Sequence, residues 1–117
     1  MKIYKTYNDL EWREHHLSAE AKNANLPFLA ENKDAKHATM FFDNGYGISV
    51  IKDAPLITGC NKFECAVIRK RGTKGEYDLD FNTGITDDVI RTNYDGEISH
   101  IMHRIQDLPP ATQKDIK

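Results

Sequence analysis

Four carboxylates in the last third of the chain are the side chains best suited to chemistry. Asp78 and Asp80 stand at alternate positions of an apolar-polar run over residues 77–81, so a strand there places both on one face. Asp87 and Asp88 follow soon after. Paired carboxylates of this kind hold Mg²⁺ for phosphoryl chemistry. Because no lysine, histidine or glutamate follows at a spacing typical of such enzymes, a metal-dependent hydrolase using Asp78 and Asp80 ranks third among the functions considered.

The same carboxylates suit a binding role. If all four face solvent, they form an acidic surface that complements a basic protein partner. Thr86 precedes Asp87 and Asp88 in the pattern of a cap and first turn of a short helix. Residues 77–117 carry eight acidic and four basic side chains, so the acidic character belongs to the whole C-terminal third.

A basic, glycine-bracketed hairpin tip precedes the acidic strand. Its cations, which would contact the phosphates of a nucleic acid, are Arg69, Lys70, Arg71 and Lys74. The chain as a whole carries a net charge of −2, whereas nucleic-acid domains usually have a basic excess. Nucleic-acid binding through this hairpin is therefore the second choice.

Histidines and cysteines give no pattern of an active or metal site. His100 and His103 are three residues apart on one expected helix, but no further ligands converge on them by sequence. Cys60 and Cys65 are five apart, and Cys65 lies in an apolar strand, where a thiol behaves as a small hydrophobe. The sequence also lacks a nucleophile elbow and a phosphate-binding glycine loop. We expect no enzymatic activity, no cofactor and no metal.

Trp12 lies on an expected N-terminal helix over residues 9–24, with Asn8 as its N-cap and Glu11 as capping-box partner. The proline-containing residues 26–29 are expected to end this helix. Its apolar stripe is thin and partly alanine, which predicts packing on one side or against a partner. Trp12 is therefore a candidate anchor for a protein partner.

Four strands are expected after this helix, at residues 39–42, 46–51, 63–68 and 77–81. Asn44-Gly45 between the first two is typical of a tight hairpin turn in which both residues adopt positive φ. A final helix is predicted by one apolar face, with Asp95 as its cap and Pro109-Pro110 as its stop. That face consists of Ile98, Ile101, Met102, Ile105 and Leu108.

These elements predict an α+β fold: an antiparallel four-stranded sheet packed by a C-terminal amphipathic helix, with an additional N-terminal helix. A chain of 117 residues has the size of a single domain. Within it we expect an N-terminal helical extension (1–37), a β-sheet-plus-helix body (38–109) and a loose tail (110–117). No apolar run is long enough to cross a membrane, and the first residues lack the apolar core of a secretory signal, so a cytoplasmic location is expected.

The run FFDNGYGISVI, residues 41–51, resembles the opening of a family of short, mostly uncharacterised bacteriophage and prophage proteins. The resemblance continues through residues 63–68, a tyrosine strand, the segment 86–90 and a closing helix, and covers roughly residues 40–109. The loop over residues 52–61 is less glycine-rich than in that family. The resemblance implies a small viral accessory protein built on a sheet and a helix, and it carries over no catalytic residue.

The expected function is that of a phage accessory protein that binds a host protein in the bacterial cytosol and inhibits or redirects it. A DNA-handling component of host defence is the favoured target, as for an anti-CRISPR protein, because carboxylates can occupy a site evolved for phosphates. The expected interface comprises Asp78, Asp80, Asp87, Asp88 and Trp12. Self-association of the chain is left open.

Overall fold

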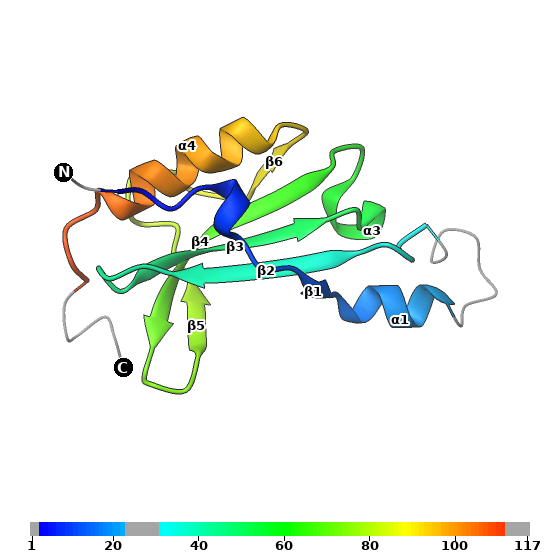
Figure 1. Ribbon diagram of the computed structural model, residues 1–117, viewed down its shortest axis with the longest axis horizontal. Coiled ribbons are helices and arrows are strands. Elements are labelled where there is room, and N and C mark those ends of the chain that lie inside the picture. Colours follow the sequence, from blue (N-terminus) through cyan, green and yellow to red (C-terminus); the bar gives the residue numbers. More distant parts are fainter. Residues whose placement is uncertain (1–2, 23–30, 112–117) are drawn as a thin grey trace.

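The computed structural model describes residues 3–22 and 31–111 (Figure 1). Their strands form one antiparallel six-stranded sheet in the order β1-β2-β3-β4-β5, with β6 also paired to β4. The elements are η1 (Tyr7–Asp9, a 3-10 helix), β1 (Arg13–Glu14), α1 (His16–Lys22), β2 (Lys36–Phe41), β3 (Tyr46–Lys52), α3 (Pro55–Thr58), β4 (Phe63–Arg71), β5 (Glu76–Leu79), β6 (Ile90–Thr92) and α4 (Asp95–Gln106). The expected α+β class, with an antiparallel sheet and a C-terminal helix, is confirmed. The expected number of four strands is too low, because β1 and β6 are too short to show a period in the sequence.

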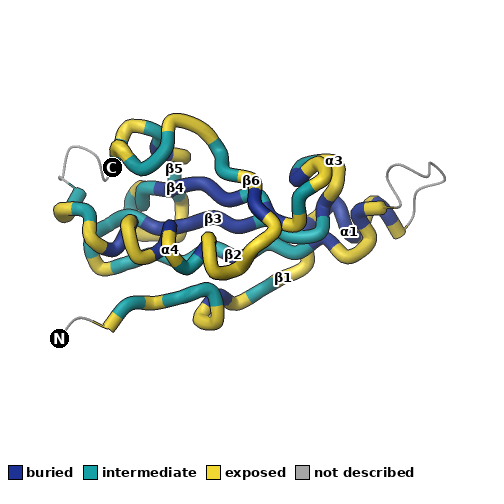
Figure 2. Tube along the Cα trace, turned by 90° about the horizontal axis from the view of Figure 1, so that it is seen from above, coloured by how far each residue is buried: buried dark blue, intermediate teal, exposed yellow. Residues whose placement is uncertain are grey.

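β4 is the central strand. One of its edges pairs with β3 over residues 63–69, and the other is shared by β6 at residues 63–65 and β5 at residues 68–71. A continuous apolar run suits this position, because a central strand is buried on both faces. Figure 2 shows β3 and β4 buried along most of their length. β5 and β6 therefore pair with the same edge of β4, at its two ends.

α4 covers one face of the sheet through the apolar side chains that the sequence predicts (Figure 1). Ile98, Ile101, Met102 and Ile105 are buried there, and Leu108 is half-buried at the edge of the same core. The sheet contributes Ala38, Ile48, Val50, Phe63, Cys65 and Val67, and the N-terminal segment contributes Leu10.

The start of α4 differs in detail from the expectation. Asp95 is its first residue, and the N-cap position is held by Tyr94 without a side-chain cap. Thr92 organises this end of the helix instead. Its Oγ1 accepts a hydrogen bond from the backbone N–H of Tyr94 (3.2 Å) and donates one to the Glu97 carboxylate (2.9 Å).

The second face of the sheet is covered only at one end by the described helices (Figure 1). There Leu17 of α1 and Ile57 of α3 pack around Ile51 with two small buried residues, Ala35 and Ala54. Further along this face no described helix lies over β2, β4 and β5.

The expected helix over residues 9–24 is wrong at its beginning. A capping box between Thr6 and Asp9 closes the single 3-10 turn η1, so Asn8 is not the cap. Leu10 then turns into the core, and β1 pairs with β2 through Arg13 and His37. Pairing with an open sheet edge satisfies backbone groups that a helix would otherwise have satisfied, and α1 begins only at His16. The expected end at residues 26–29 and the expected loose tail beyond residue 111 lie outside the described residues.

The turn at Asn44-Gly45 is confirmed, but its type differs. Gly45 has a φ of 87°, whereas Asn44 is not among the residues with positive φ. The N–H of Gly45 donates to the carbonyl of Phe42 (3.1 Å), and the N–H of Phe42 donates to the carbonyl of Tyr46 (2.7 Å). This is the pattern of a three-residue hairpin loop in which a left-handed glycine forms a bulge, so only one residue has to adopt positive φ.

No helix among the residues of the described segments is both long enough and apolar enough to cross a membrane.

Candidate functional site

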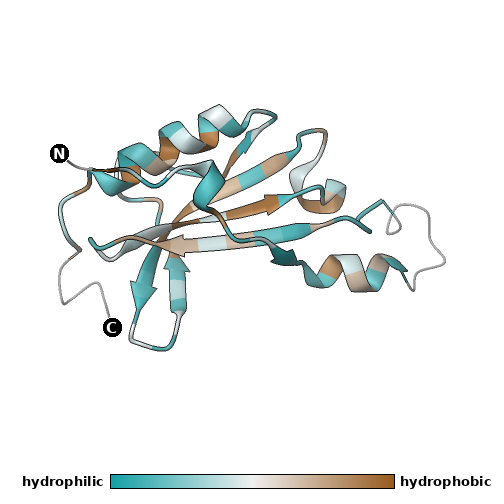
Figure 3. Cartoon of the chain, viewed as in Figure 1, coloured by the Kyte–Doolittle hydropathy of each residue, from teal (hydrophilic) through white to brown (hydrophobic). Residues whose placement is uncertain are grey.

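The hairpin of β4 and β5 projects from the sheet (Figure 1) and carries the expected basic residues and two of the four expected carboxylates, Asp78 in β5 and Asp80 just after it. Its two strands neutralise each other. Arg69 lies 3.3 Å from Asp80, and Arg71 lies 3.6 Å from Glu76 and 3.5 Å from Asp78. Figure 3 shows the distal part of the hairpin as hydrophilic. The expected acidic face and the expected basic tip are therefore two sides of one ladder of ion pairs, and neither offers a surface of a single sign.

Asp80 is buried, with 6% of its surface exposed, so the expectation that it faces solvent is wrong. One carboxylate oxygen accepts a hydrogen bond from Arg69, and the other accepts one from the backbone N–H of Asn82 (2.9 Å). The alternation along β5 predicts correctly which residues share a face. It does not predict which face is covered, and at this end the carboxylate face is the one on the side of α4.

Asp87 and Asp88 are exposed but lie apart from the hairpin, in the loop that leads to β6. The expected short helix is wrong there. The Thr86 hydroxyl accepts from the N–H of Asp88 (3.2 Å) and donates to the Asp88 carbonyl (2.8 Å), and the Asp88 carboxylate accepts from the N–H of Val89 (2.7 Å). These local bonds satisfy the backbone without a helix. The four expected carboxylates thus form no common surface.

The basic residues are also divided. Arg69 and Arg71 point to the face of the ion pairs, whereas Lys70 pairs across the hairpin with Tyr77 and points to the second face. Lys74 lies exposed at the tip. A track of four adjacent cations for a phosphate backbone is not formed.

Trp12 is not on a helix. It lies just before β1 and is half-buried against the core, where its ring centroid is 5.9 Å from that of Tyr7. The Lys52 ammonium lies 4.3 Å from the centroid of the indole ring, a cation–π distance. Much of the ring is therefore already used within the chain, and a role for Trp12 in binding stays a prediction.

An apolar patch lies on the second face, at the base of the hairpin. It consists of Phe41, Tyr77 and Leu79 above the fully buried Ile68. The Phe41 and Tyr77 rings meet edge to face at 6.0 Å, and Leu79 has 51% of its surface exposed. We refer to these four residues as the hairpin patch. The alternation of residues 77–81 contains the signal for this patch, but its period is also that of a strand whose apolar face is buried.

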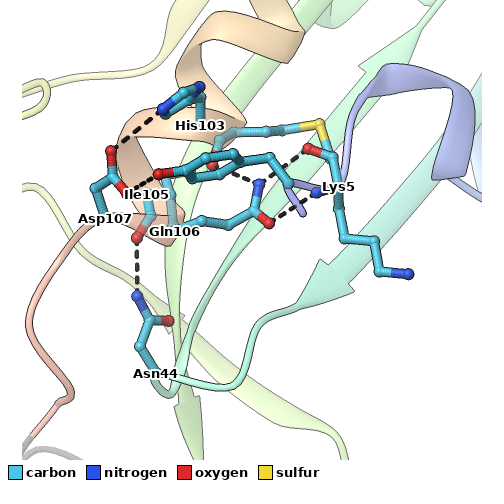
Figure 4. A network of polar contacts seen from close by, with 8 residues as sticks. Lys5, Asn44, His103, Ile105, Gln106 and Asp107 are labelled. Atoms are coloured by element: carbon cyan, nitrogen blue, oxygen red, sulfur yellow. Dashed lines mark hydrogen bonds and ion pairs between the residues drawn. The ribbon is translucent and has the colours of Figure 1, made fainter. Parts of the chain in front are cut away.

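A second feature lies at the open end of β2, where the chain leaves a hollow of about 470 Å³. Ile3 and Lys5 line it on one side, residues 41–44 line it on another, and Gln106, Leu108 and Pro110 at the end of α4 complete it. Figure 4 shows the polar contacts that hold these segments together. The Gln106 amide accepts from the N–H of Lys5 (2.8 Å) and donates to the Lys5 carbonyl (2.9 Å), as a neighbouring strand would.

Tyr4 and Asn44 bind the same end of α4, where Figure 4 shows the contact of Asn44. The Tyr4 ring stacks on His103 at 3.7 Å, and its hydroxyl donates to Asp107 (2.5 Å). The Asn44 side chain donates to the carbonyls of Ile105 (2.8 Å) and Leu108 (3.1 Å). His103 is thus packed and paired with Asp107 at 3.3 Å.

Three histidines meet where β1 and α1 approach β2. The His15 ring centroid lies 4.2 Å from that of His16 and 5.8 Å from that of His37. Burial, and after it repulsion by Arg13 and His15, lowers the pKa of His37 to about 4. Among residues 3–22 and 31–111, no three histidine, cysteine or carboxylate side chains are placed to hold a metal ion.

Neither cysteine is in a disulfide. Cys65 is buried, as the apolar pattern predicts, and burial raises the pKa of its thiol to about 12. A thiol of this kind is not nucleophilic at neutral pH.

In comparisons with known proteins, no family model, no curated protein and no solved structure matches the chain. The resemblance to phage proteins therefore stays a prediction.

Proposed function

We propose that this chain is a non-catalytic binding protein that captures a host protein, as a small phage accessory protein acting in the bacterial cytosol would. The observation that carries the proposal is the hairpin patch. Exposed Leu79 and the half-buried ring of Tyr77 lie on the hairpin that projects from the sheet, and the half-buried ring of Phe41 lies beside them at the end of β2. Large apolar and aromatic side chains of this kind are the usual anchors of protein interfaces.

The charges of the hairpin suit a polar rim around such anchors. Arg71, Glu76 and Asp78 are exposed or partly exposed and already paired, so a partner need not supply matching charges to approach. Binding through the patch should therefore depend weakly on salt. The charge argument for a DNA-handling target now rests on Asp87 and Asp88, which are exposed but lie elsewhere.

The two other functions lack an observation that favours them. Nucleic-acid binding would use Arg69 and Arg71, and both are paired with carboxylates of the same hairpin. A hydrolase would use Asp78 and Asp80 to hold Mg²⁺, and an arginine lies beside each of them. A neighbouring cation competes with a metal ion for a carboxylate.

The test compares two exposed leucines. Leu79 has 51% of its surface exposed and Leu56, on α3 at the far end of the sheet, has 55%. Immobilised parent protein, Leu79→Asp and Leu56→Asp are each incubated with nuclease-treated bacterial lysate. We expect the parent and Leu56→Asp to retain the same specific protein and Leu79→Asp to lose it.

Two outcomes would contradict the proposal. If Leu79→Asp captured the protein as well as the parent does, the hairpin patch would not be part of the interface. Retention of nucleic acid in untreated lysate, lost on Lys70→Glu with Lys74→Glu but not on Leu79→Asp, would favour the second function instead.

A further inference from the structure

The outer edge of β2 is only partly paired. β1 pairs with Lys36 and His37, and within the described residues no strand continues along β2 to Phe41. The N–H of Phe42 bonds to β3, so the backbone groups of its neighbour Phe41, and of Thr39 two residues earlier, point away from β3. The hollow between the N-terminal segment and residues 41–44 adjoins this edge and leaves it accessible. An open edge of this kind is a template for another strand.

We propose that the edge pairs with the same edge of a second copy of this chain. The pairing is antiparallel about a two-fold axis at Phe41, so that Phe41 of one copy exchanges both backbone hydrogen bonds with Phe41 of the other. This register starts beyond β1 and so avoids it. The Phe41 ring stays against Tyr77 on the second face, so the pairing uses the backbone of Phe41 and not its side chain.

Charge complementarity identifies a second copy as the occupant. In this register Asp43 of one copy, the first residue of its hairpin loop, comes close to Thr39 of the other. Within each chain the Arg13 guanidinium already lies 3.3 Å from the Thr39 hydroxyl. Asp43 and Arg13 are both exposed in the single chain. The edge thus carries a cation at one end and an anion at the other, and a two-fold axis matches each with its opposite twice.

The proposed dimer does not depend on the proposed function and would add to it. β5 lies at the opposite edge of the sheet from β2 (Figure 2). Pairing of the two edges therefore leaves Leu79 and the hairpin at the two outer ends of one continuous sheet. A dimer would present the hairpin twice, which raises avidity for a partner with repeated sites.

The test is sedimentation of the purified full chain at submillimolar concentration. We expect the parent to have twice the monomer mass of 13.4 kDa. Asp43→Arg alone and Arg13→Asp alone place like charges across the axis and should each raise the dissociation constant about tenfold or more. The double variant, Asp43→Arg with Arg13→Asp, restores opposite charges and should restore the dimer.

Hydrogen exchange supplies a readout that needs no variant. The amide of Phe41 should be protected in concentrated parent and lose protection on dilution, whereas the amides of α4 stay protected throughout and report an intact fold. A monomeric parent would overturn the proposal. So would a dimer in which both single variants associate like the parent, or one in which Phe41 exchange is independent of concentration.

Discussion

His37 is held in its neutral form by contacts on both ring nitrogens. Arg13 lies 3.3 Å from Nδ1, and a guanidinium only donates, so Nδ1 is the acceptor. Nε2 then carries the proton and donates to the Ser49 hydroxyl at 2.8 Å. A second proton would have to be added beside Arg13 in a partly buried position. This explains why the pKa of His37 is lowered to about 4, first by burial and then by Arg13.

The consequence is a loss of stability in mild acid. Above the ordinary pKa of 6.5 both folded and unfolded chains have a neutral His37; below it the unfolded chain takes up a proton that the folded chain refuses until about pH 4. The free energy of unfolding should therefore fall by on the order of 2 kcal/mol across this window, after allowance for solvent screening of a half-buried ring. His15, whose pKa burial also lowers, adds to the loss with the same sign.

Denaturant unfolding at a series of pH values measures this effect. In the variant His37→Gln the free energy of unfolding should change less steeply with pH, at pH values above the range in which carboxylates titrate. A parent whose stability does not change between neutral pH and pH 5 would show that the folded chain protonates His37 at its ordinary pKa.

At the scale of single residues, sequence patterns predict which side chains share a face of a strand better than they predict whether that face is exposed. The alternation of residues 77–81 places Asp78 and Asp80 together, as the structure does, yet Asp80 is buried and Leu79 is exposed. Which face is covered depends on where α4 lies, and that is a tertiary property. Cys65 was predictable because an apolar run in a central strand is buried on either face.

At the scale of elements, Asn44 couples the β2–β3 hairpin to the end of α4. Its amide donates to the carbonyl of Ile105 in the last turn of α4 and to that of Leu108 just after the helix, and its Oδ1 accepts from the N–H of Tyr46. One side chain in the hairpin turn thus binds backbone carbonyls that lie 61 and 64 residues further along the chain. The turn was predictable from Asn-Gly, but this contact was not, because a sequence separation of this size carries no local signal.

Asn44→Ala should lower the free energy of unfolding by about 1–3 kcal/mol, since it removes a donor to two carbonyls at the end of α4 and a side-chain acceptor for the N–H of Tyr46. Thermal or denaturant melts measure the loss. The matched control is Asn8→Ala, an exposed asparagine in η1 that is not its cap, which should change stability by less than about 0.5 kcal/mol. If the two variants melted alike, the contacts of Asn44 would contribute nothing beyond the turn itself.

Long periodic elements were predictable and short ones were not. α4 and strands β2 to β5 each carry several residues in one period. β1 has two residues, and its strand conformation depends on pairing with Lys36 and His37 rather than on its own pattern. The expected helix over residues 9–24 failed for this reason: helix propensity is a weak preference, and an open sheet edge overrides it.

At the scale of the whole molecule, apolar contacts divide into two unequal clusters. The larger one joins α4, the central strands and Leu10 under one face of the sheet. The smaller one joins Leu17, Ala35 and Ala54 with Ile51 and Ile57 at the far end of the other face. Two of the three buried residues of the smaller cluster are alanines, so it buries little surface. The α1 end should therefore open without unfolding of the main core.

Two truncations test this division. Ile105 is fully buried in the larger cluster, and Ile105→Ala should cost about 2–5 kcal/mol of global stability. Leu17→Ala removes the largest buried side chain of the smaller cluster, and its cost is limited to the free energy with which α1 already opens. Native-state hydrogen exchange should then show faster exchange of the α1 amides in Leu17→Ala and unchanged exchange of the β4 amides. In Ile105→Ala the β4 amides should exchange faster. If Leu17→Ala accelerated exchange in β4 as much as Ile105→Ala does, the two clusters would form one cooperative unit, and the α1 end would be as integral to the fold as α4.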